Sequence, residues 1–150
     1  MHTDFRQRLA AAYDGWAASR GTTPSLFFEL MDEAIEFESV LEREYASDPI
    51  SGPFHGRAAV IKYWTAIAES WELVASKTFG IVADGDTLIW NGRVRWRHRR
   101  TLQEFDSPKI DVWTVWQGRA IRYFEMFDTA AYARVSDLAM PAPQEAATAP

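Results

Sequence analysis

Apolar residues recur at helical spacing in three stretches of the chain, and a fourth short helix is expected near its end. The first stretch, residues 5–19, carries a stripe three or four residues apart. A second, residues 23–31, opens with Thr-Pro, which suits a helix N-cap followed by first-turn proline. The third covers residues 57–70, and a threonine can cap the last helix, residues 129–135. The first stripe consists of Phe5, Leu9, Tyr13 and Trp16.

Strand-like alternation occupies most of the remaining chain. It appears in residues 34–40, 71–83, 87–101, 110–116 and 120–127, with turn residues between the last four. Asp84-Gly85-Asp86 and Gln117-Gly118 predict hairpin turns, Ser107-Pro108 predicts a loop, and Asn91-Gly92 predicts a bulge.

The order of these elements predicts an α+β fold. Helices come first and antiparallel strands afterwards, so three helices are expected to close one face of a bent, cone-shaped sheet. Such a sheet encloses a hollow suited to a small apolar ligand. Residues 42–56, rich in turn residues, are expected to form a loop over or beside that hollow. One domain is predicted for residues 1–138, followed by a disordered tail at residues 139–150.

Composition supplies the material for such a hollow and excludes several kinds of chemistry. Of the 150 residues, 47% are hydrophobic, including seven Trp and nine Phe, which is enough for a core and a cavity wall. The absence of Cys excludes disulfides and cysteine metal sites and fits a reducing compartment, so the cytoplasm is expected. No apolar run is long enough to predict a membrane span.

Alternating arginines on one predicted strand raise the question of nucleic-acid binding. Arg93, Arg95 and Arg97 lie opposite the apolar side that carries Trp90 and Trp96. A net charge of −5 disfavours phosphate binding, so these arginines are expected to face acidic residues of neighbouring strands or of a second subunit. The outer sheet face is therefore a candidate homodimer surface.

Four short motifs and their order carry a resemblance to a known superfamily. The chain resembles SnoaL-like and ketosteroid-isomerase-like members of the nuclear transport factor 2-like superfamily, over about residues 5–133. The resemblance implies a cystatin-like α+β roll that binds small apolar molecules and dimerises through its sheet. The motifs are Asp32-Glu33-Ala34, Gly56-Arg57, Ile110-Asp111-Val112 and Gly118-Arg119.

The resemblance also implies three catalytic positions. Ketosteroid isomerases use a carboxylate base opposite an oxyanion hole made by a tyrosine and a neutral aspartic acid. Tyr13 and Asp111 stand at the two donor positions, Glu38 stands at the base, and Trp64 replaces the family's helix-three tyrosine. Alternation places Glu38 with Glu36 on the water-facing side, unless a bulge turns it inward.

Glu125 is a second candidate for the base. It shares a strand face with Tyr123 and Phe127, and that face looks into the cone if the alternate residues of the preceding strand pack outward. Its position matches an essential aspartate of limonene epoxide hydrolases, although Arg95 interrupts the triad of those enzymes. The alternative is a structural pair between Glu125 and an arginine.

Aromatic residues and one histidine complete the predicted site. Tyr13-Asp14 is similar to the Tyr-Asp pair of scytalone-dehydratase-like proteins, which also use histidines, and His98 continues the apolar face of its strand. The expected ligand-binding residues are Trp64, Trp90, Trp96, His98, Tyr123 and Phe127.

These residues predict a cofactor-free isomerase, cyclase or dehydratase that acts by general acid/base chemistry on a ketone-like substrate. A noncatalytic binding module of the same fold and an assembly domain that works through its sheet face are the alternatives. No metal site is expected, because the sequence lacks zinc, calcium and phosphate-binding motifs.

Overall fold

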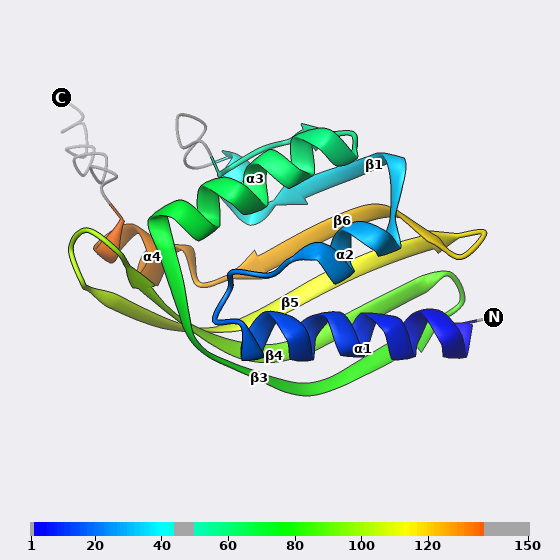
Figure 1. Ribbon diagram of the computed structural model, residues 1–150, viewed down its shortest axis with the longest axis horizontal. Helices are drawn as coiled ribbons and strands as arrows, with labels where there is room; N and C mark the ends of the chain where they lie inside the picture. The colour runs from blue at the N-terminus through cyan, green and yellow to red at the C-terminus, as the bar shows by residue number, and fades with distance from the viewer. Residues whose placement is uncertain (1, 44–49, 137–150) are drawn as a thin grey trace, which may run out of the picture.

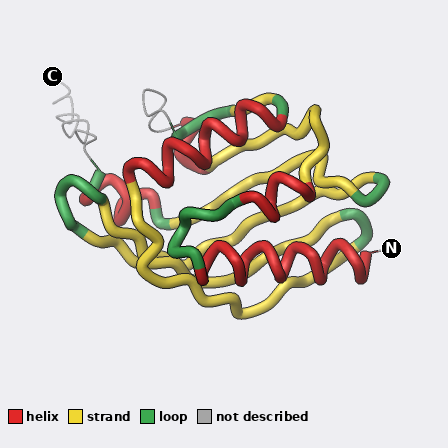
Figure 2. The backbone as a smooth tube through the Cα atoms, in the orientation of Figure 1, coloured by secondary structure: helices red, strands yellow, loops and turns green. Residues whose placement is uncertain are grey.

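A curved six-stranded sheet with helices over one face forms the molecule (Figures 1 and 2). The computed structural model describes residues 2–43 and 50–136. Within these residues, the predicted α+β class is confirmed: the sheet is mostly antiparallel, and the first three helices lie on its concave side. The expected tail at residues 139–150 lies outside the described residues.

The helices begin and end close to the predicted positions. They are α1 (His2–Ala18), α2 (Ser25–Leu30), α3 (Arg57–Ser70) and α4 (Thr129–Val135). In Figure 1, α1 and α3 run along the sheet with α2 between them, and α4 lies at the end of the sheet where α3 meets β3. The apolar stripe of α3 is buried and consists of Val60, Tyr63, Trp64 and Ile67.

The strands follow the spatial order β2-β1-β6-β5-β4-β3. All neighbours pair antiparallel except β1 and β6, whose parallel pairing brings the first strand of the chain beside the last. Their bounds are β1 Met31–Ser39, β2 Phe54–His55, β3 Trp71–Asp84, β4 Thr87–His98, β5 Glu104–Trp116 and β6 Arg119–Phe127. A 3₁₀ helix, Val40–Arg43, follows β1, and residues 44–49 of the expected loop lie outside the described residues.

The inner face of the sheet is built from aromatic residues at period two. Trp90 on β4 and Trp113 on β5 are almost completely buried there, and Trp90 donates from Nε1 to Thr78 Oγ1 at 2.9 Å. The Trp90 indole lies against Gly92, where an added Cβ would collide with that ring and with the Lys77 carbonyl. Glycine is therefore required beside this wall of the core.

Three local predictions differ from the structure. The bulge expected at Asn91-Gly92 lies opposite, on β3, where the register shifts between Thr78 and Gly80. The cap of α4 is Asp128, whose carboxylate accepts from the Ala131 amide at 2.9 Å, because the carboxylate reaches the first-turn amides. The sequence had suggested Thr129 for that cap.

The third difference concerns β5, which begins at Glu104 and passes through the predicted loop at Ser107-Pro108. Pro108 pairs with Arg93 of β4, but the ladder to β6 ends one residue later, at Lys109. Pro108 therefore occupies an edge position, where the missing N–H of proline is tolerated. This longer strand places Lys109 on the same face as Asp111.

Candidate functional site

Two adjoining hollows lie between the inner face of the sheet and the helices. Their cavity volumes are about 50 Å³ and about 40 Å³, and Tyr63, Trp96, Lys109 and Glu125 are among the residues that line both. Hollows of this size admit a few waters or part of a small ring compound, and they are smaller than the sites that enclose drug-sized ligands.

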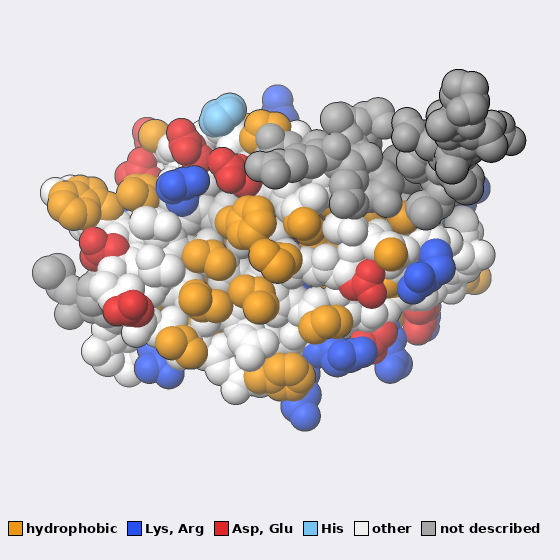
Figure 3. Space-filling model, turned by 180° about the vertical axis from the view of Figure 1, so that it is seen from behind, with side chains coloured by type: hydrophobic (Ala, Val, Ile, Leu, Met, Phe, Trp, Pro, Cys, Tyr) orange, Lys and Arg blue, Asp and Glu red, His pale blue; other side chains and the backbone are white. Residues whose placement is uncertain are grey.

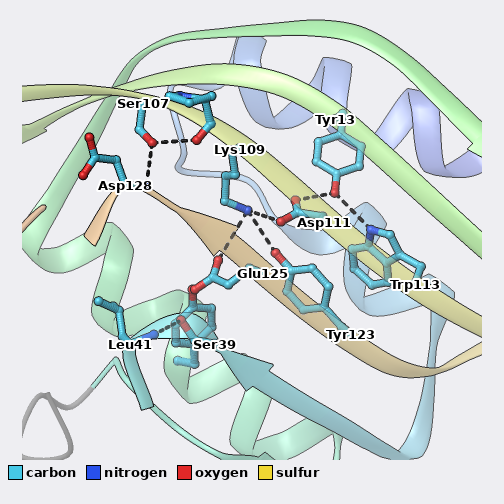
Figure 4. A network of polar contacts seen from close by, with 12 residues as sticks. Tyr13, Ser39, Leu41, Ser107, Lys109, Asp111, Trp113, Tyr123, Glu125 and Asp128 are labelled. Carbon is cyan, nitrogen blue, oxygen red and sulfur yellow. Dashed lines mark hydrogen bonds and ion pairs between the residues drawn. The ribbon is translucent and has the colours of Figure 1, made fainter. Parts of the chain in front are cut away.

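Asp111 on β5 is the centre of a buried polar network (Figure 4). The Tyr13 hydroxyl donates to Asp111 Oδ2 at 2.6 Å, and the Trp113 indole donates to the Tyr13 oxygen at 3.0 Å. Because indole N–H is only a donor, the Tyr13 hydroxyl accepts from Trp113 and donates its own hydrogen bond to Asp111.

Lys109 joins the two carboxylates of the site. Its side chain is only 14% exposed, and Nζ pairs with Asp111 Oδ1, with Glu125 Oε2 at 3.3 Å and with the Tyr123 hydroxyl at 3.2 Å. An ammonium has three hydrogens, so these three acceptors satisfy it. With Lys109, Asp111 and Glu125 all ionised, one unit of negative charge remains in the network.

Glu125 on β6 is held from the opposite side by α3. The Tyr63 hydroxyl donates to Glu125 Oε1 at 2.7 Å, and only 5% of the Glu125 side chain is exposed. Each carboxylate oxygen therefore accepts one hydrogen bond, from Tyr63 or from Lys109, and keeps further acceptor capacity. Because Glu125 lines both hollows, that capacity is available to a ligand in either.

Burial and the two carboxylates change the acidities of their neighbours. Burial, reinforced by Asp111, raises the pKa of Tyr13 well above its ordinary value. Burial, reinforced by Glu125, raises the pKa of Tyr63 in the same way, and burial with both carboxylates raises the pKa of Tyr123. For Lys109, burial lowers the pKa, but the attraction of Asp111 and Glu125 outweighs burial and raises that pKa overall. The tyrosines and the lysine therefore keep their protons at neutral pH.

The structure brings together three of the four predicted catalytic residues and separates the fourth. Tyr13, Asp111 and Glu125 belong to the network, although both Asp111 oxygens accept hydrogen bonds, whereas the resemblance implies a donating acid. Glu38 lies on the outer face, where its carboxylate is 3.8 Å from Arg122 and its side chain is 46% exposed. The register shift in β1 lies before Glu36, so no bulge turns Glu38 inward.

Most of the predicted ligand-binding aromatics line the hollows. Trp64, Trp90 and Tyr123 line the second, Phe127 lines the first, and Trp96 lines both. His98 is outside the described lining of either hollow. It packs edge-on against Trp71 with 4.8 Å between ring centroids, and its Nδ1 accepts from the Thr101 amide at 3.3 Å.

Three residues of the network were not among the residues predicted from the sequence. Lys109 was assigned to a loop, but its spacing of two from Asp111 would have placed both on one face of a longer strand. Trp64 was matched to the family's helix-three tyrosine, whereas the adjacent Tyr63 is the α3 residue whose hydroxyl joins the network, by donating to Glu125. Trp113 follows the same period-two rule as Asp111, so extending the face by one residue would have found it.

Within residues 2–43 and 50–136, no group of three or more His, Asp or Glu side chains is arranged to hold a metal ion. No helix in these two ranges is long and apolar enough to cross a membrane.

Fold and site define a class of protein: an α+β roll with a polar network at the inner end of an aromatic hollow. The SnoaL-like domain matches residues 9–123, so the chain belongs to the SnoaL-like family. A search of the curated proteins found no match.

Solved structures of low sequence identity share the fold. A nuclear transport factor 2-like protein from Burkholderia pseudomallei superposes with a TM-score of 0.71 at 16% identity, covering 89% of this chain and 98% of that one. A putative SnoaL-like polyketide cyclase from Jannaschia sp. has a TM-score of 0.69 at 15% identity, covering 91% and 94%. TerC, crystallised with polyporic acid, has a TM-score of 0.69 at 16% identity, covering 86% and 95%.

Proposed function

We propose that this protein binds a small apolar ketone-like molecule in the hollows and moves a proton within it by general acid/base catalysis. The observation that carries the proposal is the position of Glu125. Its carboxylate is nearly buried, lines both hollows and lies among aromatic side chains that exclude water. A carboxylate in such surroundings can act as a base toward a carbon-bound proton.

The proposed reaction is an isomerisation through an enolate. The Glu125 carboxylate takes a proton from the carbon beside the carbonyl, and the C–H electron pair forms the enolate double bond as charge moves to oxygen. The resulting carboxylic acid then returns the proton to another carbon of the same molecule. Base and proton are regenerated, so the cycle needs no oxidant, reductant or cofactor. Cyclisation and dehydration begin with the same proton abstraction.

Glu125 is a better base for this reaction than the other two carboxylates. Each of the two inner carboxylates accepts from one tyrosine and from Lys109, but Asp111 lines only the second hollow, whereas Glu125 lines both. Glu38 faces away from both hollows. We therefore assign Glu125 to proton transfer and Asp111 to holding Lys109 and Tyr13 in place.

The neighbours support a small, largely apolar ligand. One is named a putative polyketide cyclase, and another was crystallised with polyporic acid. Both share only the fold with this chain. Together with the aromatic lining, they favour a ligand with rings and a carbonyl group.

Proton abstraction can be tested without knowing the natural substrate. Exchange of α-hydrogens for deuterium, followed by NMR in D₂O on small ketones including 3-cyclohexenone, reports abstraction even where no product accumulates. Glu125→Gln should slow the protein-dependent exchange about 100-fold or more, because the side-chain amide of glutamine is too weak a base to accept the proton at neutral pH.

Glu38→Gln is the matched control, because it makes the same chemical change on the outer face. Its exchange rate should equal that of the wild type. Equal rates in the wild type and Glu125→Gln, with the ketone bound to both, would reject the catalytic proposal.

A noncatalytic binding module is the second candidate function. The observation in its favour is that the carboxylates and the ammonium of the network are already paired with one another or with tyrosines. Saturated polar networks stabilise and specify a core without taking part in a reaction. Binding of the ketones with no exchange above the rate in buffer would favour this candidate.

We also propose that the protein forms a homodimer through the outer face of the sheet. Figure 3 shows apolar side chains grouped at the centre of that face, and Ile110 and Met126, which pair across β5 and β6, are 39% and 47% exposed. Acidic residues of β1 lie on one side of this centre, and the arginines of β4 lie on the other. A two-fold axis that lies in the interface and runs parallel to the strands through this centre would place the acidic side of one subunit against the arginines of its partner.

A further inference from the structure

The network contains one hydroxyl proton that has no acceptor in the described part of the chain. The Tyr13 hydroxyl donates a hydrogen bond to Asp111, and the Tyr63 hydroxyl donates one to Glu125. The Tyr123 oxygen accepts from Lys109 at 3.2 Å, and no bond in which Tyr123 donates is present among the described residues. Because a phenol both accepts and donates, a donor remains for a bound molecule.

We propose that Tyr123 donates this hydrogen bond to the ligand's carbonyl oxygen, and that the ligand is a small, flat, uncharged ketone with one such oxygen. The inference rests on the proposed function, because it supplies the oxyanion donor that proton abstraction requires. It also replaces the donor pair implied by the resemblance, since Tyr13 and Asp111 are bonded to each other.

Neighbouring aromatic rings fix the position of the Tyr123 ring and therefore of its hydroxyl oxygen. It stacks on Trp113 with 4.2 Å between ring centroids, on Phe37 at 4.7 Å and on Trp64 at 5.7 Å. Only 3% of the residue is exposed, and it lines the second hollow. Because the ring is fixed on these faces, rotation of the O–H bond is the freedom that remains, and binding costs little ordering entropy.

Lys109 strengthens Tyr123 as a donor without deprotonating it. An ammonium that donates to the phenol oxygen withdraws electron density from the O–H bond, so the hydroxyl gives a stronger hydrogen bond. Burial and the two carboxylates raise the pKa of Tyr123 well above its ordinary value, so the proton is present at neutral pH. The same ammonium lies near the oxygen on which enolate charge develops.

The charges in the hollows disfavour an anionic ligand. Lys109 is the cation among the lining residues of both hollows, and its three hydrogens already bind Asp111, Glu125 and Tyr123. A carboxylate or phosphate on the ligand would be buried beside two carboxylates without a free cationic partner. A neutral carbonyl needs only the Tyr123 proton.

A pair of ligands with the same shape tests this hydrogen bond. Cyclopentanone and methylenecyclopentane differ in having oxygen or CH₂ outside the ring, and NMR titration gives both affinities. In Tyr123→Phe, the ratio of ketone affinity to alkene affinity should fall about tenfold from the wild-type ratio, with alkene affinity unchanged within about twofold. Tyr132→Phe removes the same group from a buried tyrosine of α4 that is outside the lining of the second hollow, and it should keep the wild-type ratio.

The carbonyl stretch of bound ¹³C-cyclopentanone gives an independent measure. Hydrogen bonding lowers the stretching frequency, so Tyr123→Phe should raise it toward the value in hexane, whereas Tyr132→Phe should leave it low. Cyclopentanecarboxylate, the charged probe, should bind at least about tenfold more weakly than cyclopentanone.

The outcomes separate this inference from the function on which it rests. If neither neutral ligand binds the wild type, the binding chamber itself is rejected. If both bind but Tyr123→Phe keeps the wild-type ratio and frequency, the assignment of Tyr123 is overturned and the chamber stands. Carboxylate binding as tight as ketone binding would overturn the uncharged class of ligand. Circular dichroism and melting curves establish that each variant is folded.

Discussion

The two faces of β5 carry the same ionic chemistry in opposite surroundings. Asp106 on the outer face pairs with Arg93 and Arg95, and about a third of its side chain is exposed. Asp111 on the inner face pairs with Lys109 and Tyr13, and only 1% of its side chain is exposed. Water screens the outer pairs, so they contribute little to stability, whereas loss of an inner partner leaves a charge in a dry core.

Replacing each aspartate by alanine should give the largest difference. Asp111→Ala removes one of the two carboxylates paired with Lys109 and also the acceptor of Tyr13, so we expect the free energy of unfolding to fall by about 3–5 kcal/mol. Asp106→Ala on the same strand should lower it by about 1 kcal/mol or less. Urea unfolding followed by tryptophan fluorescence measures both values.

Both variants replace aspartate by alanine on the same strand, so the change in strand propensity is the same in both and cancels when their stability losses are compared. Salt sharpens the distinction, since screening weakens exposed pairs more than buried ones. The effect of Asp106→Ala should therefore shrink between about 0.05 and about 0.5 M NaCl, and that of Asp111→Ala should persist. Equal losses of stability in the two variants would contradict the comparison.

Alkaline pH should also lower the free energy of unfolding through the inner-face network, by less than Asp111→Ala does. The pKa values of Tyr13, Tyr63, Tyr123 and Lys109 are raised in the folded protein, so the unfolded chain loses these protons first. Their contribution is complete below the unfolded pKa values, near 10, and is lost as pH rises through the folded values. Each group should lower the free energy of unfolding by about 1.4 kcal/mol per pH unit in that window.

Phenolate absorbance at about 295 nm reports the ionisation of the tyrosines, while circular dichroism reports folding. The three network tyrosines should ionise only as the chain unfolds, so their share of the absorbance should rise together with the loss of ellipticity. Full ionisation of these tyrosines in a folded chain would show that the network does not retain its protons.

Most of the fold could be predicted from the sequence because local periods determine it. The α3 stripe has the 3.6-residue period, and its bounds, Arg57–Ser70, agree with the predicted ones. The hairpin between β5 and β6 was predicted from Gln117-Gly118, and both residues adopt positive φ. The start of β5 could not be predicted, because the tolerance of Pro108 depends on where β6 ends.

The site was less predictable because it depends on which side chains meet across strands. Period two placed Asp111 and Glu125 on one face, and the structure pairs them directly across β5 and β6. The cation between them was missed, since the predicted strand began at Ile110 and left Lys109 in the loop. Glu38 shows the reverse case: its alternation indicated the outer face, while the resemblance implied a catalytic base.

The outer face provides the test with the smallest expected effect on the fold. Ile110→Arg should separate the proposed dimer, because its guanidinium would be buried in an apolar contact and would lie near its own copy across the two-fold axis. Sedimentation equilibrium should show monomers for this variant. Leu102→Arg is the control, because Leu102 is 69% exposed and lies in the turn between β4 and β5, away from the centre of the face.

The monomer itself should tolerate Ile110→Arg, with the unfolding free energy of dilute protein changed by about 0.5 kcal/mol or less, because the site is at the surface of a single subunit. The opposed acidic and basic sides predict in addition that wild-type dimers dissociate more readily at high salt. A wild type that sediments as a monomer at low salt would reject the dimer and leave the inner-face network unaffected. The two faces would then differ in function as well as in burial, with the arginines of β4 serving only their acidic neighbours within the chain.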